Sequence, residues 1–240
     1  MKLLSVGSDA KTVKGEKFGF LTGILYLAPA KLSGFEVCPM RSPACTEMCL
    51  NTAGRGNMTK VQEARARKTR WYFDDRAAFM YQLCQDIEKL DAKAKRDRLT
   101  PAIRLNGTSD IAWERVPAHP YSNIMRWFPE IQFYDYTKIP KRVIKYAQGG
   151  SFPTNYHLIF SMTENNERQA RRMLENGSNV AVVFRGELPA KYRLPNSEAE
   201  WDVIDGDLSD LRFNDPSPVI VGLKAKGKAR RDTTGFVKEI

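Results

Sequence analysis

Three of the four cysteines in this 240-residue chain lie close together, at Cys38, Cys45 and Cys49. Thiolates are soft ligands, and three of them on one loop can reach a single metal centre. Zinc sites usually pair cysteines two to four residues apart, which fits only the second gap here. The histidines, His119 and His157, are far away in the sequence. We therefore predict a [4Fe-4S] cluster bound by the three cysteines, with a zinc site or a metal-free loop as the alternatives.

Cys84 is the remaining thiol and a candidate fourth ligand. It follows Met80 and precedes Ile87 in a predicted helix, which favours a buried and inert thiol. In one unbroken helix from Thr59 it would lie about 37 Å from the helix start, too far to reach the loop. A break at 74–75 would shorten that distance. With three protein ligands, one iron would stay open to solvent or to a small molecule.

A glycine loop after the cysteines is a candidate cofactor-binding segment, made of Gly54, Arg55 and Gly56. It leads into a predicted helix whose Thr59 and Gln62 match a capping box. The free amide groups of a helix start attract anions. Any helix start offers the same amides, so an ordinary turn is the alternative.

The rest of the chain predicts the elements that would position these residues. Predicted strands cover 18–27, 102–106, 131–136, 156–162, 180–184, 201–204 and 219–223, and predicted helices cover 59–98 with a break near 74–75, 121–127, 141–147 and 165–175. Alternating strands and helices with apolar strand cores predict a parallel sheet. We expect a single α/β domain over residues 1–240, a complete or partial (β/α) TIM-type barrel with the cluster loop at 38–49 after the first strand. An open doubly wound sheet is the alternative, since 186–200 shows no helical pattern.

Polar residues follow several predicted strands, and barrel enzymes place their reactive groups at the carboxyl ends of strands. Our candidate catalytic residues are Arg104, Asn106, Asp135 and Lys224. A buried Arg104 would need a carboxylate, which Asp135 or Asp205 could supply. Ordinary loop polarity and helix caps explain such residues equally simply.

The net charge of +10 and the pI of about 9.5 favour a polyanionic partner such as nucleic acid. The aromatic residues Trp71, Tyr72, Trp113 and Trp127 are candidates for stacking on bases. A solvated basic surface is the alternative. We expect no membrane partner, because no apolar run approaches the roughly 18 residues of a membrane span. Sparse, clustered cysteines and the lack of a signal peptide predict a cytoplasmic protein.

A strand followed by a three-cysteine loop and a βα barrel resembles the radical S-adenosylmethionine enzymes. That resemblance implies a [4Fe-4S] cluster whose fourth iron binds S-adenosylmethionine. The family spaces its cysteines C-x3-C-x2-C, and this chain departs from that at both gaps. The glycine-rich motif of the family is also replaced, by Asn-Gly-Thr-Ser-Asp at 106–110.

Several long motifs spread along the chain carry a second and closer resemblance. They lie at 27–30, 38–40, 51–56, 104–110, 133–138, 155–158, 205–207 and 221–227. On these motifs the chain resembles the phage gene product 88 family over nearly its whole length. The resemblance implies a viral protein working in the cytoplasm of a bacterial host, and it implies no established reaction.

Two functional hypotheses follow. The first is a phage iron–sulfur protein whose polar strand ends bind a small-molecule substrate above the cluster, with radical-type catalysis as one outcome. The second is a basic nucleic-acid-binding protein with a structural metal site and no catalysis. The substrate and the reaction are not specified by the sequence.

Overall fold

The fold is built on one large mixed sheet. The computed structural model describes residues 1–7 and 10–240, with the backbone alone for residues 10–12. The described residues form ten strands in the order β1-β2-β3-β4-β5-β6-β9-β8-β7, and β10 pairs with β6. From β2 to β8 every neighbouring pair is parallel, while β1 and β7 pair with their neighbours in antiparallel fashion. The path ends at β1 on one side and β7 on the other, so the sheet is not closed among the described residues.

The boundaries of the elements are as follows. The strands are β1 (Leu4–Val6), β2 (Phe20–Leu25), β3 (Thr100–Arg104), β4 (Gln132–Thr137), β5 (Tyr156–Ser161), β6 (Val180–Phe184), β7 (Lys191–Tyr192), β8 (Trp201–Asp205), β9 (Ile220–Lys224) and β10 (Val237–Lys238). The α-helices are α1 (Ala10–Glu16), α2 (Pro43–Glu47), α3 (Thr59–Asp74), α4 (Arg76–Arg96), α5 (Ile124–Trp127), α6 (Pro140–Gln148) and α7 (Glu167–Glu175). Short 3₁₀ helices are η1 (Leu50–Thr52), η2 (Gly54–Asn57), η3 (Trp113–Arg115), η4 (Arg212–Asn214) and η5 (Gly227–Arg231).

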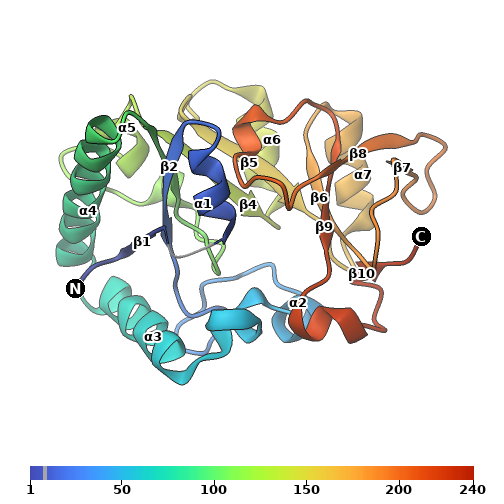
Figure 1. Ribbon diagram of the computed structural model, residues 1–240, viewed down its shortest axis with the longest axis horizontal. Coiled ribbons are helices and arrows are strands. Elements are labelled where there is room, and N and C mark those ends of the chain that lie inside the picture. Colours follow the sequence, from blue (N-terminus) through green and yellow to red (C-terminus); the bar gives the residue numbers. More distant parts are fainter. Residues whose placement is uncertain (8–9) are drawn as a thin grey trace.

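The carboxyl ends of the parallel strands share one edge of the sheet, as parallel pairing requires. In Figure 1 this is the lower edge, along which α2, α3 and the red helical turn η5 run. Helices α4, α6 and α7 pack on one face of the sheet, and α1 packs against β2 on the other face. We call the first face the helical face and the second the open face.

Helix α4 shows why the helical face forms. Phe79, Leu83, Ile87 and Leu90 recur every three or four residues, which places them on one side of the helix. All four are buried against β2 and β3, and burial of each such side chain stabilises the fold by roughly 1.5–3 kcal/mol. The helix begins after Asp75, whose carboxylate accepts a hydrogen bond from a backbone N–H of the first turn.

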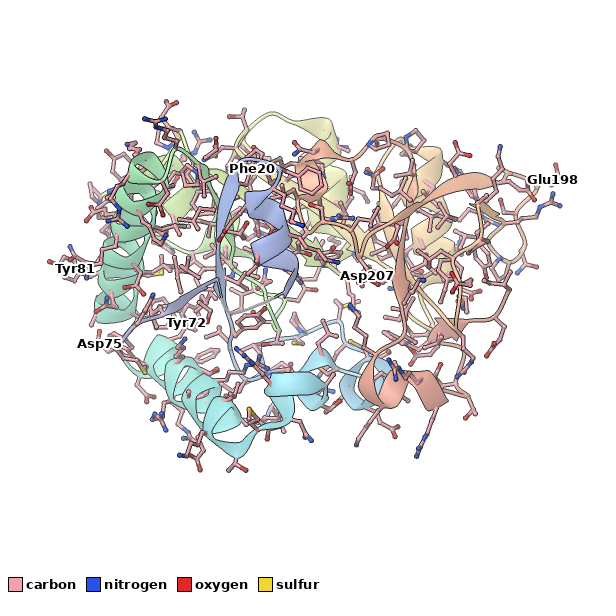
Figure 2. The ribbon with its side chains drawn as sticks, viewed as in Figure 1. Phe20, Tyr72, Asp75, Tyr81, Glu198 and Asp207 are labelled. Carbon is pink, nitrogen blue, oxygen red and sulfur yellow. The ribbon has the colours of Figure 1, made fainter. Side chains whose placement is uncertain are left out.

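Alternation along the strands decides which side chains reach which face. On β4, Phe133 packs with Ile103 on the helical face. Its neighbour Tyr134 packs with Phe213 on the open face. Phe20 joins them at the amino end of β2, far from α3, and Tyr72 of α3 belongs to the core of the helical face (Figure 2).

The predicted α/β class and the predicted break at 74–75 are confirmed, and 186–200 contains only the short strand β7. The barrel stays a prediction. The capping box is wrong, because Thr59 is already helical and Met58 occupies the cap without a side-chain hydrogen bond. No described helix has the length and apolar character that a bilayer crossing demands.

Candidate functional site at the carboxyl edge

The cysteine segment lies across the carboxyl edge and is tied to the end of β5. Ser42 caps α2 by accepting a hydrogen bond from the Cys45 N–H at 3.0 Å. Glu164, which follows β5, accepts hydrogen bonds from Ser42 Oγ at 2.6 Å and from the Ala44 N–H at 3.2 Å. These bonds hold α2 at a defined position over the strand ends.

The predicted [4Fe-4S] cluster is wrong. Across residues 1–7 and 10–240, no group of three or more His, Cys, Asp or Glu side chains is arranged to hold a metal ion. Cys38 precedes a turn, Cys45 lies within α2, and Cys49 precedes η1, so the three thiols come from three separate local structures. Cys84 is buried in the core under α4. S-adenosylmethionine, which the cluster would have anchored, loses its attachment point as well.

Two thiols of the cysteine segment, Cys38 and Cys49, are largely buried. Cys38 Sγ accepts a hydrogen bond from the Ala30 N–H at 3.5 Å and faces the carbonyl of Thr108 at 3.8 Å. Burial raises the pKa of Cys38 to about 12 and also raises the pKa of Cys49. Both groups are therefore neutral thiols at physiological pH.

Lys138 lies beside these thiols at the carboxyl end of β4. Its Nζ is 3.0 Å from Ser161 Oγ on β5. Burial acts to lower the pKa of Lys138, but the nearby acidic groups, Cys45 first and then Asp110, act to raise it and prevail, so the pKa is raised. Lys138 is thus a cation, and among the described residues no carboxylate lies within 4.0 Å of its ammonium.

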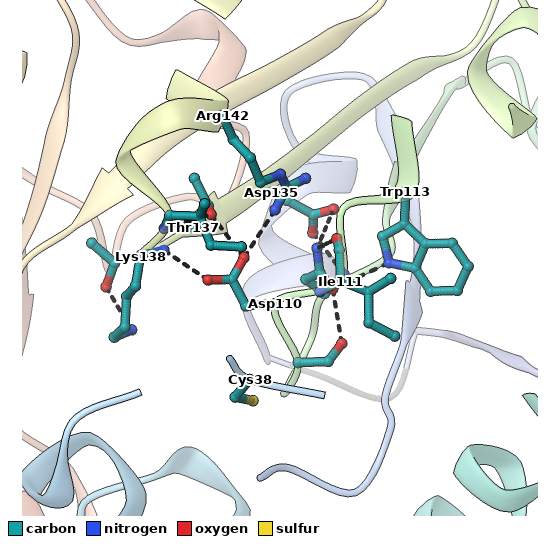
Figure 3. Close-up of polar contacts among 12 residues, drawn as sticks. Cys38, Asp110, Ile111, Trp113, Asp135, Thr137, Lys138 and Arg142 are labelled. Carbon is teal, nitrogen blue, oxygen red and sulfur yellow. Dashed lines mark hydrogen bonds and ion pairs between the residues drawn. The ribbon is translucent and has the colours of Figure 1, made fainter. Parts of the chain in front are cut away.

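Asp110 lies at the centre of a hydrogen-bond and ion-pair network next to Lys138 (Figure 3). Its carboxylate accepts hydrogen bonds from Thr137 Oγ1 at 2.7 Å and from the Lys138 N–H at 2.8 Å. Arg142 of α6 donates to it at 2.9 Å and forms a two-bond ion pair with Glu114. The network fixes the end of β4 and the start of α6.

Asp135 and Asn106 form a second part of this network. Asp135 accepts hydrogen bonds from the Asn106 N–H at 2.7 Å and from Tyr156 Oη at 2.7 Å. Burial raises the pKa of Asp135 to about 7, although these hydrogen bonds act to lower it. The Asn106 side chain also accepts a hydrogen bond from Trp113 Nε1 at 3.1 Å.

Arg104 lies on the open face and does not join Asn106 and Asp135. Its Nη1 bonds to Asp210 at 2.9 Å, and its guanidinium lies 4.6 Å from the centroid of the Tyr136 ring. The prediction that Asp135 or Asp205 pairs with Arg104 is therefore wrong. Asp210 comes from the loop that directly follows Asp205 at the end of β8.

Lys224 stands apart from the other three candidates. It ends β9, pairs with Glu187 at 3.3 Å, and lines a surface pocket with Arg185 and Arg230. The loop of Gly54, Arg55 and Gly56 forms η2 at the same edge. Its role in binding an anion stays a prediction.

The excess positive charge of the protein lies in two segments, 51–73 and 224–231. Together they contain eleven of the 38 Lys and Arg residues and one of the 28 Asp and Glu residues, so the remainder has 27 of each and is neutral. The segments meet at the carboxyl edge: a Cβ on Gly227 would lie 2.9 Å from Ala53 Cβ, and Met48 packs on Ala225 and Ala229. We call this surface the basic edge. Its exposed cations are Arg55, Lys60, Arg67, Arg70, Lys226, Lys228, Arg230 and Arg231.

Comparison with known proteins adds one finding. Residues 2–240 match the family model described as gene product 88. The chain belongs to the gene product 88 family. This agrees with the motif resemblance and supports a phage protein. No curated protein and no solved structure matches this gene product 88 sequence, so the radical S-adenosylmethionine resemblance has no support from them.

Sequence reasoning missed Lys138, Ser161, Asp110 and Arg142 as members of the site. Lys138 had a usable signal, because it continues the alternation of Tyr134 and Tyr136 along β4. Two of the aromatic residues proposed to stack on bases, Tyr72 and Trp113, are buried in the core.

Proposed function

We propose that this gene product 88 protein binds nucleic acid along the basic edge. The observation that supports the proposal is that the whole net charge of +10 resides in the two segments that meet there. Phosphate groups are regularly spaced anions, and a row of Lys and Arg side chains gains affinity by releasing their counterions. A neutral body with one basic edge therefore favours a polyanion approaching from that side.

The pocket beside β6 and β9 adds local support. Arg185, Lys224 and Arg230 line it, and all three belong to the same edge of the sheet. Arg185 is held in place by hydrogen bonds to the carbonyls of Arg230 and Asp232 and by an ion pair with Glu239. A fixed arginine beside exposed surface cations can contact phosphate groups.

The test is binding of a 30-nucleotide single strand and a 30-base-pair duplex, measured by fluorescence anisotropy between 50 and 200 mM salt. We expect affinity to fall steeply with salt. The triple variant K228Q/R230Q/R231Q should reduce the slope of log K against log salt by about 3. The matched control K89Q/K93Q/K95Q removes the same charge from α4 and should leave the slope nearly unchanged. Absence of binding at 50 mM salt, or equal losses in both triples, would contradict the proposal.

A further inference from the structure

A pocket of about 330 Å³ lies between the start of α7 and the turn at 195–196. Its volume falls within the range of small-molecule sites, roughly 300–1,000 Å³. Its walls carry two negative and two positive side chains, Glu164, Glu167, Arg168 and Arg171. Among the described residues that line the pocket, Pro195 alone has an apolar side chain. The pocket therefore favours a small ligand that is polar and that carries charges of both signs.

Two of the four charges are already paired within the fold. Glu167 forms an ion pair with Lys238 of β10, which joins the start of α7 to the C-terminal strand. Arg171 lies 3.5 Å from Glu175 on the next turn of α7 and donates a hydrogen bond to the carbonyl of Asn196. These contacts fix the walls of the pocket and leave little charge on that side for a ligand.

The other two charges have no ionic partner. The Glu164 carboxylate accepts hydrogen bonds from two neutral donors, Ser42 Oγ and the Ala44 N–H. Arg168 is exposed, and among the described residues its guanidinium forms neither a hydrogen bond nor an ion pair. Glu164 and Arg168 line the same pocket without pairing with each other, so a ligand can lie between them. A carboxylate has about four acceptor positions, which leaves Glu164 free to accept further hydrogen bonds.

We propose that this pocket binds a free α-amino acid with a small or polar side chain, its carboxylate on Arg168 and its ammonium group on Glu164. A simple anion would also meet two glutamates, and a simple cation would meet two arginines. Asn165 accepts a hydrogen bond from Thr163 Oγ1 at 2.9 Å through its side-chain oxygen, which leaves its NH₂ group to donate to the ligand. A large apolar side chain would find only Pro195 to cover it.

The first experiment is isothermal titration of the whole protein with L-serine, L-asparagine and L-glutamine, each up to roughly 10 mM. At least one of them should bind saturably. Its N-acetyl and α-amide derivatives each lack one of the two charges and should bind about tenfold more weakly or worse. No binding of any of the three, or a derivative that binds as tightly as its parent, would overturn the proposal.

The second experiment locates the site with variants. R168Q changes an exposed side chain without a partner in the described fold, so it should fold normally and weaken binding about tenfold or more. The matched control R172Q removes an exposed arginine of α7 that does not line the pocket, and it should bind like the wild type. Unchanged affinity in R168Q, or an equal loss in R172Q, would place the ligand elsewhere and refute the site.

This site is independent of the basic edge. None of the residues that line the pocket belongs to the segments 51–73 and 224–231. The triple variant K228Q/R230Q/R231Q should therefore bind the amino acid as tightly as the wild type does, and R168Q should keep the salt dependence of nucleic-acid binding. A loss of amino-acid binding in the triple variant would contradict the assignment to this pocket, whatever the outcome of the nucleic-acid test.

Discussion

Arg142 and Lys138 lie four residues apart at the junction of β4 and α6, and they differ in burial and in bonding partners. Arg142 is almost completely buried and bonds to Asp110, Glu114 and Tyr156. Lys138 is partly exposed and bonds to one neutral hydroxyl. Arg142 is therefore fixed by direct ion pairs within the fold, whereas among the described residues the Lys138 ammonium has no carboxylate in direct contact.

The largest expected effect comes from removing the Arg142 guanidinium, which forms direct ion pairs with Asp110 and Glu114. Arg142→Met leaves Asp110 and Glu114 buried without a counter-charge, which should lower the free energy of unfolding by about 3–5 kcal/mol. Lys138→Met should change it by no more than about 1 kcal/mol, because only one neutral hydrogen bond is lost. Urea denaturation measures both, and similar losses would remove the distinction between the two cations.

The free energy of unfolding should also depend on pH through Asp135, which is linked to Arg142 by Tyr156. The pKa of Asp135 is raised from 3.8 to about 7 in the folded protein, so the folded state retains a proton that the unfolded state releases. The stabilisation is complete below pH 4 and is lost as pH rises through 7, by up to about 4 kcal/mol at about 1.4 kcal/mol per unit.

Asp135→Asn keeps an acceptor for the Asn106 N–H and has no proton to lose. The stability of the wild type minus that of D135N should therefore decrease from pH 4 to about pH 7 and level off above it in urea titrations. His157, whose pKa burial lowers to about 4, contributes equally to both proteins and cancels. A pH-independent difference would show that Asp135 is ionised throughout.

A smaller effect is expected at Glu164, which ties the cysteine segment to the end of β5. Glu164→Gln retains one acceptor for two donors, Ser42 Oγ and the Ala44 N–H, and should cost about 1–2 kcal/mol. Hydrogen exchange should become faster over 42–49 in this variant. Glu175→Gln, an exposed change at the end of α7, serves as the control, and equal exchange in both would mean that Glu164 does not anchor the segment.

The smallest effect tests how weakly Lys138 is held. Ser161→Ala removes its hydroxyl partner on β5 and should lower stability by no more than about 1 kcal/mol in urea. A loss as large as that of R142M would mean that Lys138 belongs to the structural network after all.

The sequence predicted the strands well because apolar runs such as 180–184 have no competing pattern. It failed at the cysteines, because spacing along the chain does not show whether three thiols are arranged to hold one metal ion, and among the described residues they are not. It also failed at the partner of Arg104, because the sequence does not show which carboxylate in or after β8 contacts Arg104. Charge can be counted from the sequence alone, but only the fold shows that 51–73 and 224–231 adjoin.

The confinement of charge to one edge has a consequence for how the molecule meets other molecules. A neutral body with a positive rim is an electric dipole, and the field of a distant polyanion exerts a torque on it. Rotation during diffusion then turns the basic edge towards the polyanion before any contact forms. The thiols and the Lys138 ammonium, which lie at that same edge, would be presented first at each encounter.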